Sequence, residues 1–288
     1  ISVLYRSVDN AGNIEADQTV SIWLDQTNPT IADDFTQEST WLATNQTINL
    51  TVADALSGLA SYSYSLDGGA TVDNTPAVSV SGSGQHTVVV LATDNAGNPA
   101  TATIPVWIDL LAPTITHDYS NGTAWNTGSV TIAFGATDAH SGVATLGYEL
   151  NGGTFTAGTS ITLTTSGSVI LIATDAVGNE SRETITVNID ELPPVTTDNY
   201  ALDGSWTNTI SLITLTATDD ISGVASTSYT IDGTTTVGTQ FTVATEGQNS
   251  VLYRSVDNAG HTEADQTVSI WLDQTNPTIA DDFTQEST

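Results

Sequence analysis

The chain has 288 residues and a formal net charge of −30, because 33 acidic side chains face only three basic ones, Arg6, Arg182 and Arg254. Nucleic-acid binding is excluded, since neutralising phosphates requires a basic face. Disulfides and lysine-based isopeptide crosslinks are excluded too, because the sequence has neither cysteine nor lysine. With 39% hydrophobic residues, many of them β-branched, the composition indicates a folded, strand-rich chain.

Two features that the sequence lacks bear on its location and on its place in a longer chain. No apolar run approaches the ~20 residues needed to span a bilayer, and no basic-then-apolar signal segment opens the sequence, so we expect no membrane insertion in this segment. The sequence also has no methionine, so we expect an internal piece of a longer or processed chain.

The sequence contains repeats at two scales. Residues 249–288 copy residues 1–40 except at Asn249, His261 and Thr262. Within that long period, an Asp four residues before a proline recurs at Pro29, Pro113, Pro194 and Pro277, which predicts units of about 83 residues. The short motif "SVDNAGN" returns in each unit as a variant of D-x-[AV]-G.

Each unit reads as a series of short strands. In the first complete unit, apolar residues alternate with polar ones over 48–52, 62–66, 88–92 and 104–108. Turn signals such as "ALSG", "LDGG" and "DNAGN" separate these runs. Alternation with a period of two between turns predicts half-buried antiparallel strands, and about seven such strands per unit favour an immunoglobulin-like β-sandwich.

The motifs support a family resemblance. "TATDDISGVASTSYTIDG" over 216–233 and "EGQNSVLYRSVDNAGHTE" over 246–263 resemble the bacterial Ig-like tandem repeats of large surface adhesins and other extracellular repeat proteins. The likeness covers all three units, since each carries D-x-x-S-G, Y-x-[LI]-[DN]-G and D-x-[AV]-G. It implies an all-β chain of tandem immunoglobulin-like β-sandwich domains in a linear array, at the cell surface or outside the cell of a bacterium or archaeon.

The repeats divide the chain into five segments. Residues 1–28 are predicted to be the C-terminal strands of an incomplete Ig-like repeat. Residues 29–112, 113–193 and 194–276 are predicted to be complete Ig-like repeats, and 277–288 the start of the next.

Recurring aspartates form candidate metal sites. In an Ig-like sandwich, the strands that end at Asp54 and Asp94 finish at the same end of the repeat. The linker residue Asp25 and Asp34, at the start of the first strand, should arrive at that end too, so we expect four aspartates to converge at each junction. Two unit charges ~5 Å apart repel by roughly 3 kcal/mol at an effective dielectric of ~20, which favours a bound cation. The predicted ligands are Asp25, Asp34, Asp54 and Asp94 at the first junction, Asp109, Asp118, Asp138 and Asp175 at the second, and Asp190, Asp198, Asp219 and Asp257 at the third.

Two interpretations of these motifs stand. In one, Asp caps a hairpin turn and Gly supplies the positive φ, with no metal involved. In the other, the turn also contributes to an inter-domain Ca²⁺ site, because an oxygen-only ligand set suits this hard cation. The linker aspartates follow the turn aspartates by 15 or 16 residues in every unit, which favours the second interpretation.

The tryptophans fall into two sets. Trp41, Trp125 and Trp206 follow the linker proline by 12 residues, and we expect them to fill the core. Trp23, Trp107 and Trp271 alternate out of phase with the apolar residues of the last strand, so we expect them to face outward. The histidines occupy unrelated positions, and no catalytic triad recurs, so we expect no enzyme.

These patterns predict a structural role. We expect the repeat region of a long extracellular or cell-surface protein, acting as a stalk, extender or filament rod, with junctions rigidified by calcium. Its partners would be further repeats of the same chain and lateral or end-to-end copies of itself. The alternative is an adhesive module that binds glycan or host matrix through outward tryptophans or loops.

Overall fold

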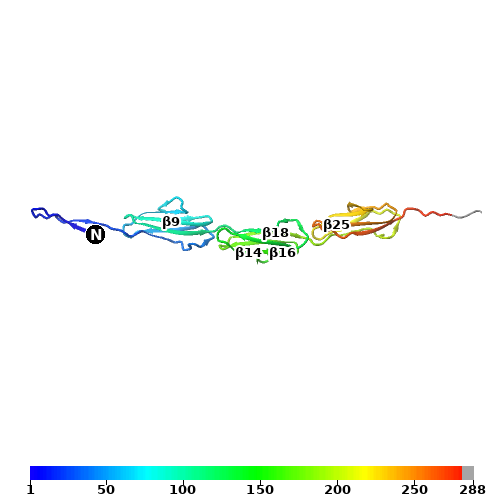
Figure 1. Ribbon diagram of the computed structural model, residues 1–288, viewed down its shortest axis with the longest axis horizontal. Helices are drawn as coiled ribbons and strands as arrows, with labels where there is room; N and C mark the ends of the chain where they lie inside the picture. The colour runs from blue at the N-terminus through cyan, green and yellow to red at the C-terminus, as the bar shows by residue number, and fades with distance from the viewer. Residues whose placement is uncertain (281–288) are drawn as a thin grey trace, which may run out of the picture. The chain divides into compact units, whose positions relative to one another are not determined.

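The computed structural model describes residues 1–280, and every regular element in that range is a β-strand (Figure 1). The expected start of a further repeat at 277–288 therefore lies mostly outside the described residues. No helix among residues 1–280 is long and apolar enough to cross a membrane. The chain divides into two compact units: the first comprises Ile1–Thr116, Gly135–Leu146 and Ile172–Arg182, and the second holds the remaining described residues.

The chain forms three β-sandwich-like domains in tandem, which confirms the predicted all-β fold. Each domain has one five-stranded and one three-stranded sheet. The strands of the first domain are β3 (Thr30–Asp33), β4 (Trp41–Leu42), β5 (Gln46–Ala53), β6 (Leu59–Leu66), β7 (Val72–Asp73), β8 (Ala77–Val80), β9 (Gly84–Asp94) and β10 (Pro99–Ile108). They are ordered β4-β10-β9-β6-β7 in one sheet and β3-β5-β8 in the other.

The second and third domains repeat this order. The second, whose strands are divided between the two compact units, contains β11 (Thr114–His117), β12 (Trp125–Asn126), β13 (Val130–Thr137), β14 (Val143–Leu150), β15 (Thr156–Ala157), β16 (Ser160–Leu163), β17 (Gly167–Asp175) and β18 (Glu180–Ile189). The third contains β19 (Val195–Asp198), β20 (Trp206–Thr207), β21 (Ile213–Thr218), β22 (Val224–Ile231), β23 (Thr234–Val237), β24 (Gln240–Phe241), β25 (Gly247–Asp257) and β26 (Gln266–Leu272).

Residues before the first domain form a separate hairpin. Strands β1 (Ser2–Tyr5) and β2 (Gln18–Ser21) pair antiparallel. Their apolar side chains are exposed, whereas Val251 and Val268, which occupy the same positions as Val3 and Val20 in the copy of this sequence in the third domain, are buried. The hairpin therefore shows the same local pairing without the second sheet that covers it there.

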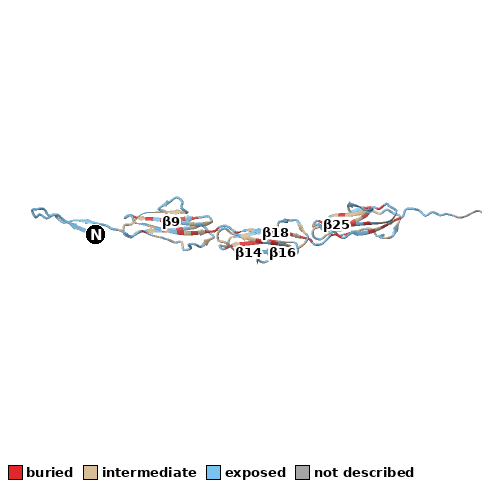
Figure 2. Ribbon diagram, viewed as in Figure 1, coloured by how far each residue is buried: buried red, intermediate tan, exposed pale blue. Residues whose placement is uncertain are grey.

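The core follows the alternation seen in the sequence. Along β5 the buried residues are Ile48 and Leu50, and along β9 they include Val88 and Val90, with exposed or half-buried residues between them (Figure 2). Fully burying one such side chain contributes about 1.5–3 kcal/mol, so this inward row holds the two sheets together. An equivalent core in the third domain includes Ile213, Val251 and Val268.

The first set of tryptophans does not fill the core as predicted. Trp41 lies on the two-residue edge strand β4, which pairs parallel with the end of β10, and Trp206 is 56% exposed on β20. The ring of Trp41 contacts Trp107 at a centroid distance of 5.6 Å, and Trp206 contacts Trp271 at 5.8 Å. The reason is the parallel pairing, which places the tryptophans of the edge strand and of the last strand side by side. Trp107 and Trp271 are therefore partly covered.

Candidate cation sites at three aspartate clusters

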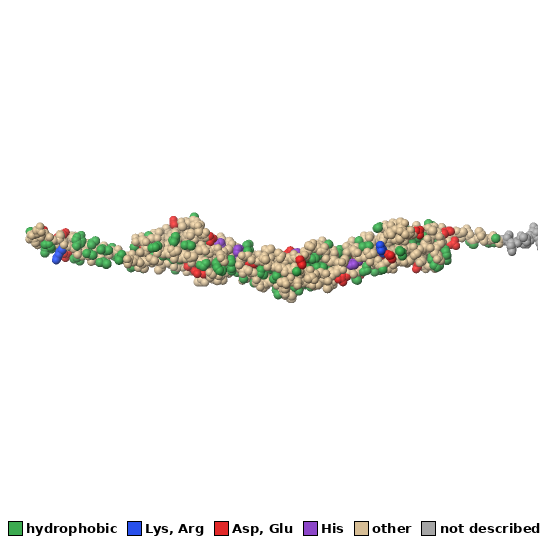
Figure 3. Space-filling view, in the orientation of Figure 1, with side chains coloured by type: hydrophobic (Ala, Val, Ile, Leu, Met, Phe, Trp, Pro, Cys, Tyr) green, Lys and Arg blue, Asp and Glu red, His purple; other side chains and the backbone are tan. Residues whose placement is uncertain are grey.

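Three groups of metal-ligating side chains recur within residues 1–280. The first cluster is Asp25, Asp54 and Asp94, the second is Asp109, Asp138 and Asp175, and the third is Asp190, Asp257 and His261. Within each cluster the ligand atoms lie within 4.8 Å of one another. On the face drawn in Figure 3, acidic side chains likewise occur in small separate groups. Each cluster thus brings together residues from the linker, from a turn and from the end of the strand before the last, which is β9, β17 or β25.

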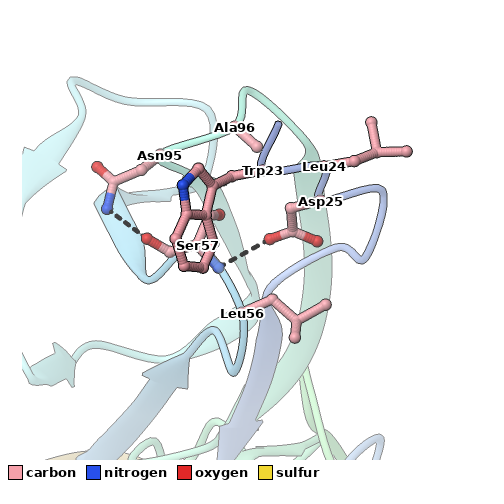
Figure 4. A pocket seen from close by; sticks show the side chains of 7 residues that line it. All are labelled: Trp23, Leu24, Asp25, Leu56, Ser57, Asn95 and Ala96. Carbon is pink, nitrogen blue, oxygen red and sulfur yellow. Dashed lines mark hydrogen bonds between the residues drawn. The ribbon is translucent and has the colours of Figure 1, made fainter. Parts of the chain in front are cut away.

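The linker aspartate is bonded to the next domain. In the first cluster, Asp25 Oδ1 accepts a hydrogen bond from Thr27 N at 2.9 Å, and its Oδ2 accepts one from Ser57 N at 2.9 Å (Figure 4). Ser57 belongs to the D-x-x-S-G turn, so this bond fixes the linker against that turn. The same bond recurs from Ser141 N to Asp109 at 3.0 Å and from Ser222 N to Asp190 at 3.1 Å.

A side-chain amide makes a second connection in the first two clusters. Asp94, at the end of β9, accepts hydrogen bonds from Asn98 N and Asn98 Nδ2, both at 2.7 Å. The same Nδ2 donates to the backbone carbonyl of Asp25 at 3.2 Å. Asn179 repeats this arrangement, donating to Asp175 Oδ2 at 2.7 Å and to the Asp109 carbonyl at 3.1 Å. One amide therefore joins the turn to the linker.

The third member of the first cluster has an unused oxygen. Asp54 Oδ1 caps its own turn by accepting from Gly58 N at 2.8 Å and Leu56 N at 3.1 Å. Its Oδ2 is buried and has no hydrogen-bond partner among the described residues. Leaving a buried acceptor unpaired costs free energy, and a cation would satisfy it. This observation fits a Ca²⁺ site, since calcium takes six to eight oxygen ligands and backbone carbonyls lie beside the carboxylates.

Hydrogen bonds keep the linker carboxylates ionised. The backbone N–H of Thr27 and the groups of Ser57 lower the pKa of Asp25. Burial by itself would raise the pKa of Asp109 and Asp190, which are both fully buried, yet hydrogen bonds, chiefly from Ser141 and Ser222, lower the pKa of each below its ordinary value. These carboxylates are therefore charged and able to bind a cation near neutral pH.

Three predicted ligands lie elsewhere, so the prediction of four converging aspartates is wrong. Asp34 accepts hydrogen bonds from Asn49 N at 2.8 Å and Asn49 Nδ2 at 2.6 Å. Because β3 runs antiparallel to β5 with Thr30 opposite Ala53, the start of β3 lies near the first cluster and its end lies ~13 Å away, four residues at ~3.3 Å each. In the other domains, Asp118 accepts from Ala133 N at 2.9 Å, and Asp198 from Tyr200 N at 2.8 Å and Tyr253 Oη at 2.8 Å.

Asp219 caps a turn beside the third cluster. Its Oδ1 accepts from Gly223 N at 2.6 Å and Ile221 N at 3.2 Å, as Asp54 and Asp138 do in their turns. The three ligand atoms that group within 4.8 Å in this cluster come instead from Asp190, Asp257 and His261. The sequence repeats show that His261 replaces an asparagine, but they do not show that His261 lies beside the linker residue Asp190.

A buried polar network in the third domain was not anticipated from the sequence. Glu263, which is 7% exposed, accepts from Thr196 N at 3.0 Å, from Ser255 N at 2.7 Å and from the Thr196 hydroxyl. The hydroxyl of Ser255 also bonds Thr196 at 2.6 Å and Thr227 at 2.8 Å. The equivalent positions are Ile31, Tyr62, Ala92 and Ala100 in the first domain and Ile115, Leu146, Ala173 and Ser181 in the second. Comparing these columns of the repeat would have revealed it.

A hollow of about 520 Å³ lies beside the first cluster (Figure 4). Trp23, which is 94% exposed, lines it together with Asp25, Leu56, Ser57 and Asn95. The corresponding rings of Trp107 and Trp271 each contact another tryptophan ring in their own domains, at a tilted angle. The exposed ring of Trp23 therefore belongs to the hairpin and is not a feature of every repeat.

The chain is an all-β tandem array of three β-sandwich-like domains joined by recurring linker contacts. No protein-family model matches the sequence, and no curated protein matches it. Among solved structures, the chain is similar to the N-terminal eight Ig domains of Down Syndrome Cell Adhesion Molecule isoform 1.30.30, with a TM-score of 0.52, 14% identity, and coverage of 94% of this chain and 40% of that one. This likeness shows the fold alone.

Two structures from adhesion proteins are also similar. One is a tetra-tandem repeat in the extending region of a large adhesion protein, with a TM-score of 0.34, 16% identity, and coverage of 95% of this chain and 81% of that one. The other comes from a 1.5-MDa bacterial ice-binding adhesin, with a TM-score of 0.31, 19% identity, and coverage of 86% and 100%.

Proposed function

We propose that the chain is part of the structural repeat region of a long extracellular or cell-surface protein, acting as a stalk, extender or filament rod and not as an enzyme. The observation that carries this proposal is the threefold recurrence of a linker aspartate bonded to the turn of the next domain, from Asp25, Asp109 and Asp190. A connection repeated at three linkers favours control of the angle between domains, since a ligand-binding site would need to occur only once.

In this proposal Ca²⁺ binds the first and second clusters. Each offers three carboxylates within 4.8 Å, and in the first the buried Oδ2 of Asp54 lacks a donor. Two carboxylates at that separation repel by about 3.5 kcal/mol at an effective dielectric of ~20, and a dication removes this repulsion. Binding would therefore stiffen the linker and protect it from proteolysis.

A calcium titration tests the proposal. We expect Ca²⁺ to raise the melting temperature and to slow cleavage in the linkers, and a chelator to reverse both. At a concentration 100 times the Kd, binding adds about 2.7 kcal/mol to the free energy of unfolding. The paired substitution D54N/D138N should abolish the response, whereas D73N, at an exposed aspartate of β7, should leave it unchanged. An unchanged melting temperature and cleavage rate in the parent chain would rule out calcium stiffening.

A glycan-binding module is the second candidate. The hollow beside the first cluster favours it, because an exposed Trp23 next to Asp25 and Asn95 combines an aromatic platform with polar groups. A glycan-array screen of the chain and of W23A tests it. Binding that is lost in W23A would support this role, and no binding by the parent chain would leave the structural role as the better account.

A further inference from the structure

The third cluster differs from the first two by one side chain. His261 stands where Asn98 and Asn179 stand, and those amides bond the linker carbonyl. His261 Nδ1 lies 3.1 Å from Asp257 Oδ2, and within residues 1–280 the imidazole makes no hydrogen bond to a linker carbonyl. The substitution therefore removes one connection to the linker and brings a nitrogen ligand to the same place.

We propose that the third cluster is a site for a divalent transition-metal ion of the Zn²⁺ type. It offers one imidazole nitrogen and two carboxylates within 4.8 Å, and the two carboxylates, Asp190 and Asp257, are 0% and 2% exposed. Imidazole with carboxylates suits zinc, whereas calcium prefers oxygen ligands alone. The inference rests on the proposed function only in taking the clusters as cation sites.

The spacing of one pair of ligand atoms suits this ion. Tetrahedral zinc with ligands at ~2.0–2.2 Å separates neighbouring ligand atoms by ~3.4 Å, and His261 Nδ1 and Asp257 Oδ2 are 3.1 Å apart. The ion would replace the proton that these two atoms share. Bound also to Asp190, it would balance the two carboxylate charges and rejoin the linker to the turn after β25.

The other histidine pairs provide controls. His86 lies 2.8 Å from Asp67, but that pair contains one carboxylate and belongs to none of the three clusters. In the second cluster, N179H would place an imidazole beside Asp109 and Asp175, as His261 lies beside Asp190 and Asp257. In H261N the third domain receives the residue that the first two domains already carry, so we expect it to fold.

The experiment is a competition titration of the metal-free chain with Zn²⁺ against a chromogenic chelator. We expect one tight site in the parent chain, at least about 10-fold weaker binding in H261N, parent-like binding in H86N, and a second site in N179H. Co²⁺ should give the absorption bands of tetrahedral coordination in the parent chain and lose them in H261N. If H261N binds Zn²⁺ as the parent does, the assignment is overturned.

The calcium titration and the zinc titration together separate this inference from the proposed function. Zinc bound at His261 with no calcium response anywhere would contradict the calcium proposal and leave the zinc site standing. A calcium response without a zinc site that depends on His261 would contradict the zinc assignment and leave the calcium proposal standing.

Discussion

Replacing Glu263 by alanine should destabilise the third domain more than any change to an exposed carboxylate. The substitution leaves two buried backbone donors, Thr196 N and Ser255 N, without their acceptor. Each unpaired buried donor costs about 1–3 kcal/mol, so we expect a loss of about 2–6 kcal/mol in the free energy of unfolding. The hydroxyl of Thr196 can keep its bond to Ser255, so it adds little to this sum.

The second domain supplies a matched control, because it carries apolar or small residues at the same positions. The fourfold variant T196I/T227L/S255A/E263S copies Ile115, Leu146, Ala173 and Ser181. Thr196 N and Ser255 N lose the carboxylate in this variant as they do in E263A, but the larger apolar side chains introduced at positions 196 and 227 offset part of that loss. We therefore expect the fourfold variant to be less destabilised than E263A. The E263Q variant keeps one acceptor oxygen and should fall between the parent and E263A.

Hydrogen exchange resolved by peptide is the suitable assay, since a chain of several domains does not unfold in one step. Peptides from β25 should exchange faster in E263A, and peptides from β9 should be unaffected. The reasoning would be refuted if E263A cost less than about 1 kcal/mol, or if the fourfold variant were as unstable as E263A.

Hydrogen bonds elsewhere in the chain give three further predictions. Folding lowers the pKa values of Asp109 and Asp190, so the stability that these carboxylates provide is fully present above their unfolded pKa and is lost as pH falls through the lower folded values. An acid titration followed by circular dichroism should therefore be shallower in D109N than in the parent. An identical slope would contradict this prediction. Burial and the bond to Asp198 raise the pKa of Tyr253 to about 12. The free energy of unfolding of the third domain should therefore fall by about 2–3 kcal/mol as pH rises from 10 to 12, and Y253F should remove that dependence. If Y253F lost as much stability as the parent, the pH dependence would have another origin. Removing the Asn179 amide in N179A should speed proteolysis of the linker after Asp109, while cleavage at the parent rate would mean that the amide does not hold the linker.

The sequence predicted the fold well because the signals are local. Alternation along 48–52 and 88–92 corresponds to β5 and β9, and the recurring Asp and Gly of "DNAGN" form the expected turn, with Gly97 at a φ of 95°. Which carboxylates meet depends instead on strand direction. Asp34 and Asp54 both flank strands of one sheet, but antiparallel pairing places Asp34 beside Asn49 in the middle of β5, whereas Asp54 follows the end of β5, and no local pattern encodes that.

What the sequence alone determined is the repeat, the strand class, the acidic character and the linker aspartates. Each of these follows from periodicity or composition, which can be read from the sequence without knowledge of packing. Only the tertiary structure decided that Trp41 contacts Trp107, that Glu263 is buried among hydroxyl groups, and that His261 lies against Asp190 and Asp257. Each of these arrangements includes residues far apart in the chain, such as Trp41 and Trp107, Thr196 and Glu263, or Asp190 and His261, and their geometry depends on the register of several strands at once.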